Sequence, residues 1–462
     1  MPNLALRPEW IRGEIAVVGL ARSGRAAALL LARAGCRVYA SDLGRSPELD
    51  ETARALERDG VHVQLGAHDL ERLARCSLVV ASPGVPPDAP PFQAAHRAGV
   101  DIVSEIEVGI RFLPDLSYIA ITGTNGKTTT TSIAGHLLAA LGLRASAAGN
   151  IGTPITELAL SPTPPSWVAL EVSSFQLHDT PSINPRVGVL TNLSANHLDR
   201  YATVDEYYAD KALLFRNATA SSNWVTNADD DAVQRMVARV AGMHARFSVQ
   251  KSSDAYLDRA QNMLVALGHP LIRRDELTLL GDHNVANALA AALAVMMADG
   301  AHRTHHALNK LRDGLRSFRA LEHRIESVGE FDGVTWINDS KSTNVASTVV
   351  AMRGMTRPTV LLLGGRHKGE PYTELRSELA RTGRAVIAYG EAGPLIERDL
   401  EGVVPLVRLG SSFEDVIATA RDLAQPGDVV LLSPACSSYD MFDNYEHRGA
   451  VFKQLAGSAA LR

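Results

Sequence analysis

Cysteine is scarce in this sequence: Cys36, Cys76 and Cys436 are the only three among 462 residues. They are far apart, odd in number and lack the short spacing of metal ligands. This pattern argues against a disulfide framework and a cysteine-based zinc site, and it favours free thiols in a reducing compartment.

Long runs of basic residues are also missing. The chain has 46 Lys and Arg residues against 51 Asp and Glu residues, which gives a formal net charge of −5. Neither the basic surface of a nucleic-acid-binding protein nor a polybasic membrane anchor is present. We therefore expect small-molecule partners and no nucleic acid.

No apolar run is long enough to cross a membrane. The longest, residues 286–298, is interrupted by Asn287 and is better explained as a buried, alanine-rich helix. The first residues, MPNLALRPEWIRGE, lack the basic segment and apolar core of a signal peptide. We expect a cytoplasmic protein without membrane insertion.

Hydrophobic residues make up 46% of the chain, enough for several buried cores, and the length predicts about three domains. Strand-like apolar runs alternate with helical periodicity, which is typical of parallel α/β sheets. We expect a Rossmann-like N-terminal domain over residues 1–115, a central P-loop ATPase-like domain over 116–318 and a Rossmann-like C-terminal domain over 319–462.

Residues 120–131, AITGTNGKTTTT, predict a nucleotide triphosphate site. An apolar strand delivers Gly123 and Gly126 into a tight turn whose backbone N–H groups and following helix N-terminus suit phosphate. Lys127 is placed to neutralise the β- and γ-phosphates and Thr128 to reach Mg²⁺. Ile121 stands where the first glycine of the usual loop is found, so the loop is a variant. The residues expected to bind the nucleotide here are Gly123, Thr124, Asn125, Gly126, Lys127, Thr128 and Thr129.

The first segment contains a second turn of this type, in IAVVGLARSG, followed by a strand that ends at Asp42. Ala21 replaces the middle glycine of a dinucleotide fingerprint, which disfavours a nicotinamide cofactor. Asp42 suits a ribose or a base, and residues 82–86 form a glycine and proline turn after a third strand. A pure scaffold is the alternative explanation of this unit.

The central segment places polar residues after apolar runs. Glu171 ends one such run and is either a magnesium ligand or simply exposed. His197 follows another and is either a ligand or a structural histidine. Lys211, by composition alone, is a surface lysine. Asn284 and Asn287 lie one helical turn apart and are able to face one ligand.

The third segment has three polar loops after strands, at residues 338–344, 364–369 and 433–440. Parallel strands bring such loops to one edge of the sheet. The basic side chains in these loops suit an anionic substrate, but an ordinary α/β domain with basic loops fits equally well.

Seven motifs occur in order along the chain: ITGTNGKTTT, LEVSSFQL, TNLSANHLDRY, GDHNVANALAA, LEHRIE, NDSKSTN and SPACSSYDMF. In these motifs the chain resembles the Mur ligase family of peptidoglycan precursor enzymes, whose relatives include folylpolyglutamate synthetase. The match covers nearly the whole chain. Within the first segment, VVGLARSG, ASPGVPPDAP and SEIEVGIRF are similar to the members that add glutamate to UDP-N-acetylmuramoyl-L-alanine.

The resemblance implies ATP-dependent amide formation through an acyl phosphate, with two Mg²⁺ ions. Thr128 would serve the first ion, while Glu171 and His197 would serve the second. Lys211 matches the lysine that the family carbamylates. The residues that the resemblance makes catalytic are Lys127, His197, Lys211 and Lys341.

The remaining matches are assigned to ligands. Adenine, ribose and phosphate correspond to Asn284, Asn287, Arg324 and Asp339. The UDP-sugar corresponds to Ser23, Asp42, Gly84 and Asn150, with His197 also near the substrate. The transferred phosphoryl group and the glutamate, D-glutamate by family default, correspond to Thr343, Lys368, Ser438, Tyr439 and Tyr445, together with Lys341.

Two positions depart from the family pattern. Asn196 stands where related ligases often carry an acid, and Gly44 stands where a basic side chain would help hold the uracil or diphosphate. We expect a monomer.

The competing hypotheses for the function are another ligase of this fold, a P-loop NTPase or phosphotransferase, and a nicotinamide dehydrogenase.

Overall fold

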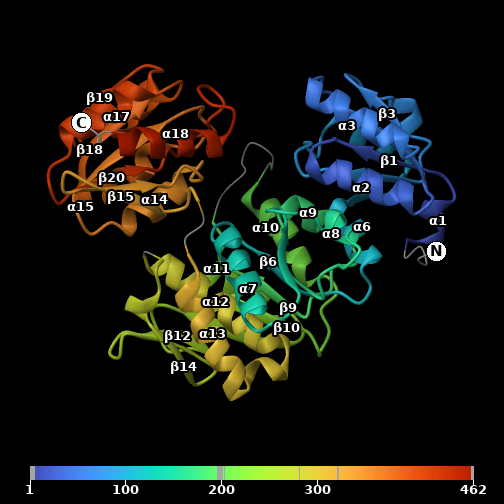
Figure 1. The fold of residues 1–462 in the computed structure, drawn as a ribbon, viewed down its shortest axis with the longest axis horizontal. Helices are drawn as coiled ribbons and strands as arrows, with labels where there is room; N and C mark the ends of the chain where they lie inside the picture. The colour runs from blue at the N-terminus through green and yellow to red at the C-terminus, as the bar shows by residue number, and fades with distance from the viewer. Residues whose placement is uncertain (1–5, 195–200, 202, 280, 320–321, 459–462) are drawn as a thin grey trace. The chain divides into compact units, whose positions relative to one another are not determined.

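Three separate β-sheets, each with helices around it, form the framework of the protein (Figure 1). The computed structural model describes residues 6–194, 201, 203–279, 281–319 and 322–458. Tertiary contacts group the chain into two units, Met1–Arg273 with Asn287–Arg316 and Arg274–Ala286 with Ser317–Arg462. The predicted α/β class is confirmed, with one sheet in each of the three predicted segments. The boundaries at residues 115 and 318 stay a prediction.

The N-terminal sheet has five parallel strands in the order β3-β2-β1-β4-β5, as expected for a Rossmann-like domain. The central strand β1 (Glu14–Val18) is buried from Ile15 onward, because helices cover both faces of such a sheet. Its other strands are β2 (Arg37–Asp42), β3 (His62–Leu65), β4 (Leu78–Ala81) and β5 (Ile102–Ser104), and the helices are α1 (Pro8–Ile11), α2 (Arg22–Arg33), α3 (Pro47–Arg58), α4 (Leu70–Leu73), α5 (Pro90–Ala98) and α6 (Glu105–Phe112).

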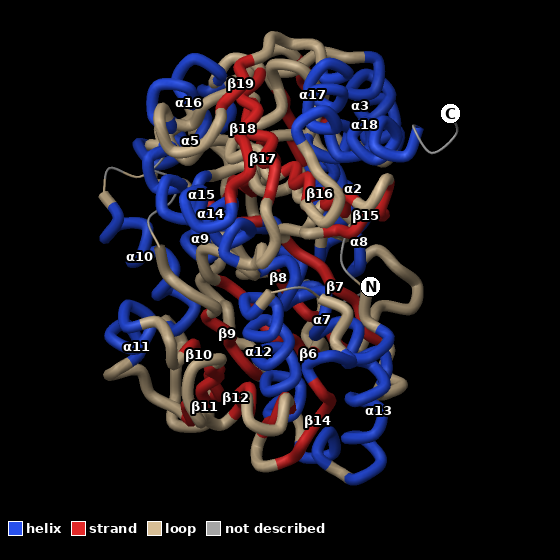
Figure 2. Tube along the Cα trace, turned by 90° about the vertical axis from the view of Figure 1, so that its left-hand side faces the viewer, coloured by secondary structure: helices blue, strands red, loops and turns tan. Residues whose placement is uncertain are grey.

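The central sheet has nine strands in the order β14-β13-β12-β11-β10-β9-β6-β8-β7. Figure 2 shows the strands in red among blue helices. Strands β6 to β12 pair with one another in parallel, whereas β13 pairs antiparallel with both β12 and β14. The strands are β6 (Ser117–Thr122), β7 (Ala145–Gly149), β8 (Trp167–Glu171), β9 (Val187–Leu190), β10 (Asn223–Asn227), β11 (Met243–Ser248), β12 (Ala255–Asp258), β13 (Met263–Ala266) and β14 (His269–Arg273).

The predicted alanine-rich helix is α12 (Asp282–Ala298), and its side chains from Ala288 to Met296 are fully buried. Alanine lets a helix that is apolar on all sides pack closely against its surroundings. The other helices of this segment are α7 (Lys127–Ala140), α8 (Ile155–Ala159), α9 (Ser174–His178), α10 (Val204–Ala212), α11 (Asp231–Val237) and α13 (His305–Ser317), with short 3₁₀ turns η1 (Leu213–Phe215), η2 (Arg274–Glu276) and η3 (Gly300–Arg303).

The C-terminal sheet has six strands in the order β15-β16-β20-β17-β18-β19. It opens with an antiparallel hairpin whose tight turn, Asp332-Gly333, has positive φ at both residues, as a type I′ turn requires. The strands are β15 (Glu326–Phe331), β16 (Val334–Asn338), β17 (Thr359–Gly364), β18 (Gly383–Tyr389), β19 (Leu406–Arg408) and β20 (Val429–Leu432), and the helical segments are α14 (Val345–Arg353), η4 (Tyr372–Leu375), α15 (Arg376–Thr382), α16 (Gly393–Leu400), α17 (Phe413–Leu423) and α18 (Tyr445–Gly457).

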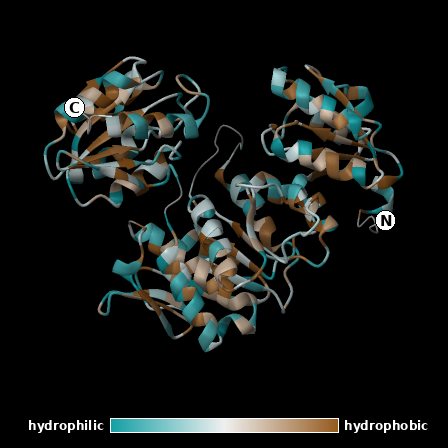
Figure 3. Ribbon diagram, viewed as in Figure 1, coloured by the Kyte–Doolittle hydropathy of each residue, from teal (hydrophilic) through white to brown (hydrophobic). Residues whose placement is uncertain are grey.

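Hydrophobic residues concentrate on the strands, which carry the brown colour in the N-terminal and C-terminal sheets of Figure 3. In the described parts of the chain, no helix combines the length and hydrophobicity that a bilayer crossing requires. The polar motifs follow the carboxyl ends of the parallel strands, where ligands of open α/β sheets bind.

Candidate active site

The phosphate loop leaves β6 and enters α7 as predicted. Gly123 and Gly126 have φ values of 144° and 79°, which L side chains rarely adopt. A Cβ atom at Gly123 would collide with Thr191, and one at Gly126 would collide with Asn287. Both glycines are therefore required by backbone conformation and by close packing.

Asn192, after β9, organises this loop and was missed by the sequence analysis. Its carbonyl oxygen accepts from the Thr124 N–H at 2.9 Å, and its Oδ1 accepts from the Asn125 N–H at 2.8 Å. Its Nδ2 also donates to the Asn125 carbonyl oxygen at 2.9 Å. Asn192 thus bonds the backbone amides of both Thr124 and Asn125 and fixes the conformation of the loop.

Two lysines converge on the loop. Lys127 Nζ donates to the carbonyl oxygens of Gly123 at 3.0 Å and Thr124 at 2.8 Å. Lys211, on α10, is 1% exposed, so the surface position suggested by composition is wrong. Its Nζ donates to Gly123 O at 2.7 Å and lies 4.5 Å from the centre of the Tyr207 ring. Burial, and secondarily the charge of Lys127, lower the pKa of Lys211 well below its usual value.

Glu171, at the end of β8, is 2% exposed, so its exposed alternative is excluded. Strand pairing sets it beside Ile121, two residues before Gly123. Its Oε1 accepts from Asn150 Nδ2 at 3.0 Å, and its Oε2 is buried without a hydrogen-bond partner among the described residues. An unsatisfied buried carboxylate oxygen costs free energy unless a cation or donor meets it. This oxygen fits a Mg²⁺ ligand.

His197 lies outside the described residues. Among the residues that are described, no three His, Cys, Asp or Glu side chains are grouped so as to hold a metal ion. Mg²⁺ at nucleotide sites commonly uses one or two carboxylates, substrate phosphates and water. A single buried carboxylate near the phosphate loop is therefore compatible with magnesium.

Asn287 ties α12 to the phosphate loop. Its Oδ1 accepts from Thr130 Oγ1, on α7, at 3.2 Å. Asn284 and Asn287 are 6% and 7% exposed. Both side-chain amides are therefore buried in the protein rather than exposed to solvent.

In the N-terminal domain, Asp42 bonds two backbone amides. Its Oδ2 accepts from Leu20 N and its Oδ1 from Gly44 N, each at 2.7 Å. The carboxylate thereby fixes the turn that carries Ser23. Strand β1 pairs with β4, which brings the turn containing Gly84 to the same sheet edge.

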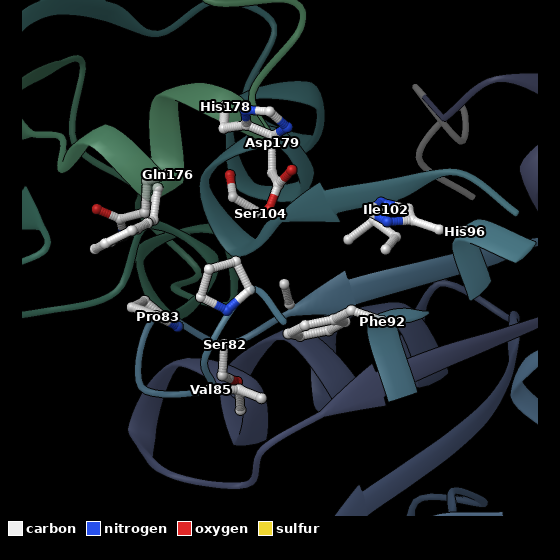
Figure 4. Close-up of a pocket in the computed structure, with 13 residues that line it drawn as sticks. Ser82, Pro83, Val85, Phe92, His96, Ile102, Ser104, Gln176, His178 and Asp179 are labelled. Atoms are coloured by element: carbon white, nitrogen blue, oxygen red, sulfur yellow. The ribbon is translucent and has the colours of Figure 1, made fainter. Parts of the chain in front are cut away.

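A small cavity lies between the N-terminal domain and α9 (Figure 4). Ser82, Pro83 and Phe92 line it from one domain, and Gln176 and Asp179 line it from the other. Gln176 is 3% exposed and its Nε2 has no hydrogen-bond partner among the described residues. This amide beside the predicted UDP-sugar turn was not singled out from the sequence.

The C-terminal loops converge as predicted. Ala435 N donates to Ser342 O at 3.0 Å, and Arg366 N donates to Ser437 O at 2.9 Å, so the three loops contact one another. Lys368 Nζ donates to Thr343 Oγ1 at 3.2 Å.

Lys341, in the first of these loops, lies close to Tyr445, the first residue of α18. Lys341 Nζ lies 3.8 Å from the centre of the Tyr445 ring. Ser438 is buried, while Tyr439 is 65% exposed. The cations of Lys341 and Lys368 thus lie close to the hydroxyl of Thr343 and the ring of Tyr445.

Asp339 is buried at the centre of these loops. It accepts from Ser433 Oγ at 2.8 Å and from Ile325 N at 3.3 Å. Burial raises its pKa to about 6, against the opposing effects of its hydrogen bonds and the charge of Arg324. The carboxylate is thus held in place by neutral donors.

Arg448, on α18, is fully buried and was missed by the sequence analysis. Its guanidinium donates to Ser340 Oγ at 2.9 Å, to Ser340 O at 2.8 Å and to Cys436 O at 3.2 Å. A weaker bond reaches Gly364 O. These acceptors lie in the three polar loops, so one side chain holds all three together. A buried arginine distant in sequence from its acceptors leaves no local pattern.

Comparison with known proteins matches three family models along the chain. They are the Mur ligase MurD-like N-terminal domain over residues 13–104, the Mur ligase middle domain over 121–295 and the Mur ligase glutamate ligase domain over 323–436. Relatives named UDP-N-acetylmuramoylalanine–D-glutamate ligase occur in Chromobacterium violaceum, at 42% identity over 96% of this chain and 97% of the relative, and in Salinibacter ruber, at 41% identity over 97% and 99%.

Solved structures share the fold at low sequence identity. The UDP-N-acetylmuramate–alanine ligase of Thermotoga maritima superposes with a TM-score of 0.61 at 19% identity, covering 97% of this chain and all of that one. MurF of Acinetobacter baumannii gives a TM-score of 0.62 at 15% identity, covering 95% and 93%. From the full-length relatives and the three matched models, this chain belongs to the Mur ligase family.

Proposed function

We propose that this chain joins D-glutamate to UDP-N-acetylmuramoyl-L-alanine with consumption of ATP, a step in peptidoglycan precursor synthesis. The observation that carries the chemistry is the convergence of Lys127, Lys211 and the buried carboxylate of Glu171 on one phosphate loop. The relatives that share 36–42% of the sequence are named for this reaction. Their name also supports D-glutamate as the amino acid.

The reaction has two covalent steps. A carboxylate oxygen of the alanine attacks the γ-phosphorus of ATP, the bond to the β-phosphate oxygen breaks, and ADP leaves with an acyl phosphate formed. The amine of glutamate then attacks the acyl carbon and loses a proton, and inorganic phosphate leaves as the amide forms.

Both groups in the first step are anions, so the protein's main tasks are positioning and charge neutralisation. Lys127, at the start of α7, supplies a fixed cation where the phosphates enter. Two bound Mg²⁺ ions would supply further positive charge, with Thr128 as a ligand of the first and Glu171 and His197 as ligands of the second.

Lys211 becomes an anionic carbamate in this proposal. Its Nζ attacks the carbon of CO₂ and releases a proton, which requires the neutral amine. The lowered pKa of Lys211 favours that form. A carbamate in place of an ammonium would also relieve repulsion from Lys127 and support the second metal.

The other proposed contacts follow the three domains. The UDP-sugar contacts Ser23, Asp42, Gly84 and Asn150. The nucleotide contacts the phosphate loop with Asn284, Asn287, Arg324 and Asp339, and the phosphoryl group and glutamate contact Lys341, Thr343, Lys368, Ser438, Tyr439 and Tyr445.

We further propose that the chain acts as a monomer in the cytoplasm. Each proposed ligand is assigned to residues of one chain, and Cys36, Cys76 and Cys436 are free thiols that suit a reducing compartment. Sedimentation of the purified protein at a mass near 49.5 kDa would agree with a monomer, and a doubled mass would contradict it.

The decisive assay measures phosphate release from ATP and Mg²⁺ with UDP-N-acetylmuramoyl-L-alanine and either glutamate enantiomer. We expect release only with the UDP-linked substrate and D-glutamate together. Release without glutamate would instead identify an NTPase. Release with L-glutamate alone would overturn the assigned enantiomer.

A further inference from the structure

Arg22 connects the N-terminal domain to the central domain through its guanidinium. Its Nε and Nη2 donate to the two carboxylate oxygens of Glu157, on α8, at 2.9 and 3.0 Å. Its Nη1 donates to Gly152 O at 2.9 Å, and Nη2 also reaches Thr153 Oγ1 at 3.4 Å. A guanidinium fork that grips a carboxylate in this bidentate way fixes orientation as well as distance.

The two ends of this connection lie in loops assigned to the same substrate. Arg22 directly precedes Ser23 and follows the turn whose Leu20 amide is held by Asp42. Gly152 lies two residues after Asn150, whose side chain and backbone amide both bond Glu171. Arg22 thus joins the UDP-sugar turn of one domain to the loop beside the proposed metal carboxylate of the other.

Helix α8 of the central domain packs on the N-terminal domain. It contacts both α2 and α6. At its start, Thr156 N and Oγ1 donate to the buried carboxylate of Glu105, on α6, at 2.6 and 2.5 Å. The Arg22 contacts therefore supplement the packing of α8 on the N-terminal domain. They fix the position of α8 relative to the UDP-sugar turn.

We propose that Arg22 is a positioning residue for the UDP-linked substrate, a role that rests on the proposed function. Arg22 fixes the turn at Ser23 relative to the loop at Asn150. It thereby sets the distance between the two places on the protein that contact this long substrate. ATP is assigned to the phosphate loop, which Arg22 does not contact in the described structure. Loss of Arg22 should therefore weaken the UDP-linked substrate selectively.

The test compares Arg22→Met with Arg33→Met. Arg33 lies on the same helix and pairs with Asp59 at 3.2 Å, and its side chain and that of Asp59 are 57% and 32% exposed, against 54% and 34% for Arg22 and Glu157. It makes no hydrogen bond to the central domain in the described structure. Arg33→Met therefore controls for the loss of an equally exposed α2 ion pair.

We expect Arg22→Met to raise the KM for UDP-N-acetylmuramoyl-L-alanine about fivefold, with the KM for ATP and the melting temperature near parent values. Arg22→Lys keeps the charge but loses the fork, so it should fall between parent and Arg22→Met. Arg33→Met should match the parent throughout.

Three outcomes would overturn the positioning role: an unchanged KM for the UDP-linked substrate in Arg22→Met, an equal rise in the KM for ATP, or the same effect in Arg33→Met. Isothermal titration calorimetry of UDP-N-acetylmuramoyl-L-alanine with the same variants compares their affinities for this substrate independently of turnover. Absence of glutamate-dependent phosphate release in the parent would count against the proposed function. The role of Arg22 is decided separately, by the ratio of the dissociation constants of the UDP-linked substrate in Arg22→Met and in the parent.

Discussion

Lys127 and Lys211 donate hydrogen bonds to the same atom, the carbonyl oxygen of Gly123. Two ammonium groups at one acceptor repel each other, and Lys211 is the buried member. Burial, and secondarily the charge of Lys127, thus lower the pKa of the amine that our proposal requires to be neutral.

Lys127→Ala should lower turnover about a hundredfold or more, because one preorganised charge aimed at a reacting centre typically contributes that much. The measurement is glutamate-dependent phosphate release. Lys310→Ala is the control, since Lys310 Nζ donates to Leu141 O, away from the phosphate loop. Near-parent turnover of Lys127→Ala would refute its phosphate role.

Lys211→Met should abolish turnover while stabilising the fold. The lowered pKa means that the unfolded chain binds more protons between the folded pKa and 10.5, so parent stability rises with pH in that window. The methionine variant lacks this dependence. Its advantage in melting temperature should be largest at low pH and shrink as the pH approaches 10.5.

The Lys211 comparison is made by thermal unfolding in buffer free of CO₂. In the same preparation, added bicarbonate should restore parent activity and leave Lys211→Met inactive. An active Lys211→Met protein, or a variant less stable than the parent at neutral pH, would contradict the assignment.

Glu105 should make stability depend on pH near neutrality. Burial raises its pKa to about 7 from 4.5, so the folded state binds the proton more tightly than the unfolded state. Stability is then greatest below about pH 4.5 and falls as the pH rises toward 7. The full change corresponds to about 3 kcal/mol.

Glu105→Gln removes this titration and keeps an oxygen for Thr156. Urea unfolding at several pH values should show that the free energy of unfolding of the variant increases relative to that of the parent as the pH rises to 7. Above pH 7 this difference should stay constant. Parallel curves for the two proteins would show that Glu105 keeps an ordinary pKa.

Arg448→Met should destabilise the C-terminal domain by about 3 kcal/mol, because the acceptors at Ser340 and Cys436 would stay buried without their donor. The loops that carry Lys341 and Ser438 would also lose their common anchor, so the KM for glutamate should rise. Urea unfolding and steady-state kinetics measure the two effects. Arg448→Lys should be intermediate, and unchanged stability of Arg448→Met would exclude the anchoring role.

Much of the fold was predictable because its signals are local. The glycines at 123 and 126 and the alanine-rich helix each reflect backbone conformation or periodicity within a few residues. The convergence of the C-terminal loops followed from parallel strands sharing one edge. The ligand assignments, including His197, which lies outside the described residues, stay predictions.

The burial of Lys211 was not predictable, because its acceptor lies 88 residues away in the sequence. The same holds for Arg448 and Ser340, separated by 108 residues, and for Arg22 and Glu157, separated by 135. Such pairs leave no periodic or spacing signal, and an arginine or lysine without context suggests a solvated surface.

By itself, the sequence determined the α/β class, the phosphate loop and the residue types available for phosphoryl transfer, because short-range sterics and hydrogen bonding specify a strand, a glycine turn and a helix. Only the tertiary structure decided which charges are buried and which are paired. Desolvation and Coulomb interactions depend on neighbours brought together from distant segments, and those neighbours distinguish Lys211 from an ordinary surface lysine.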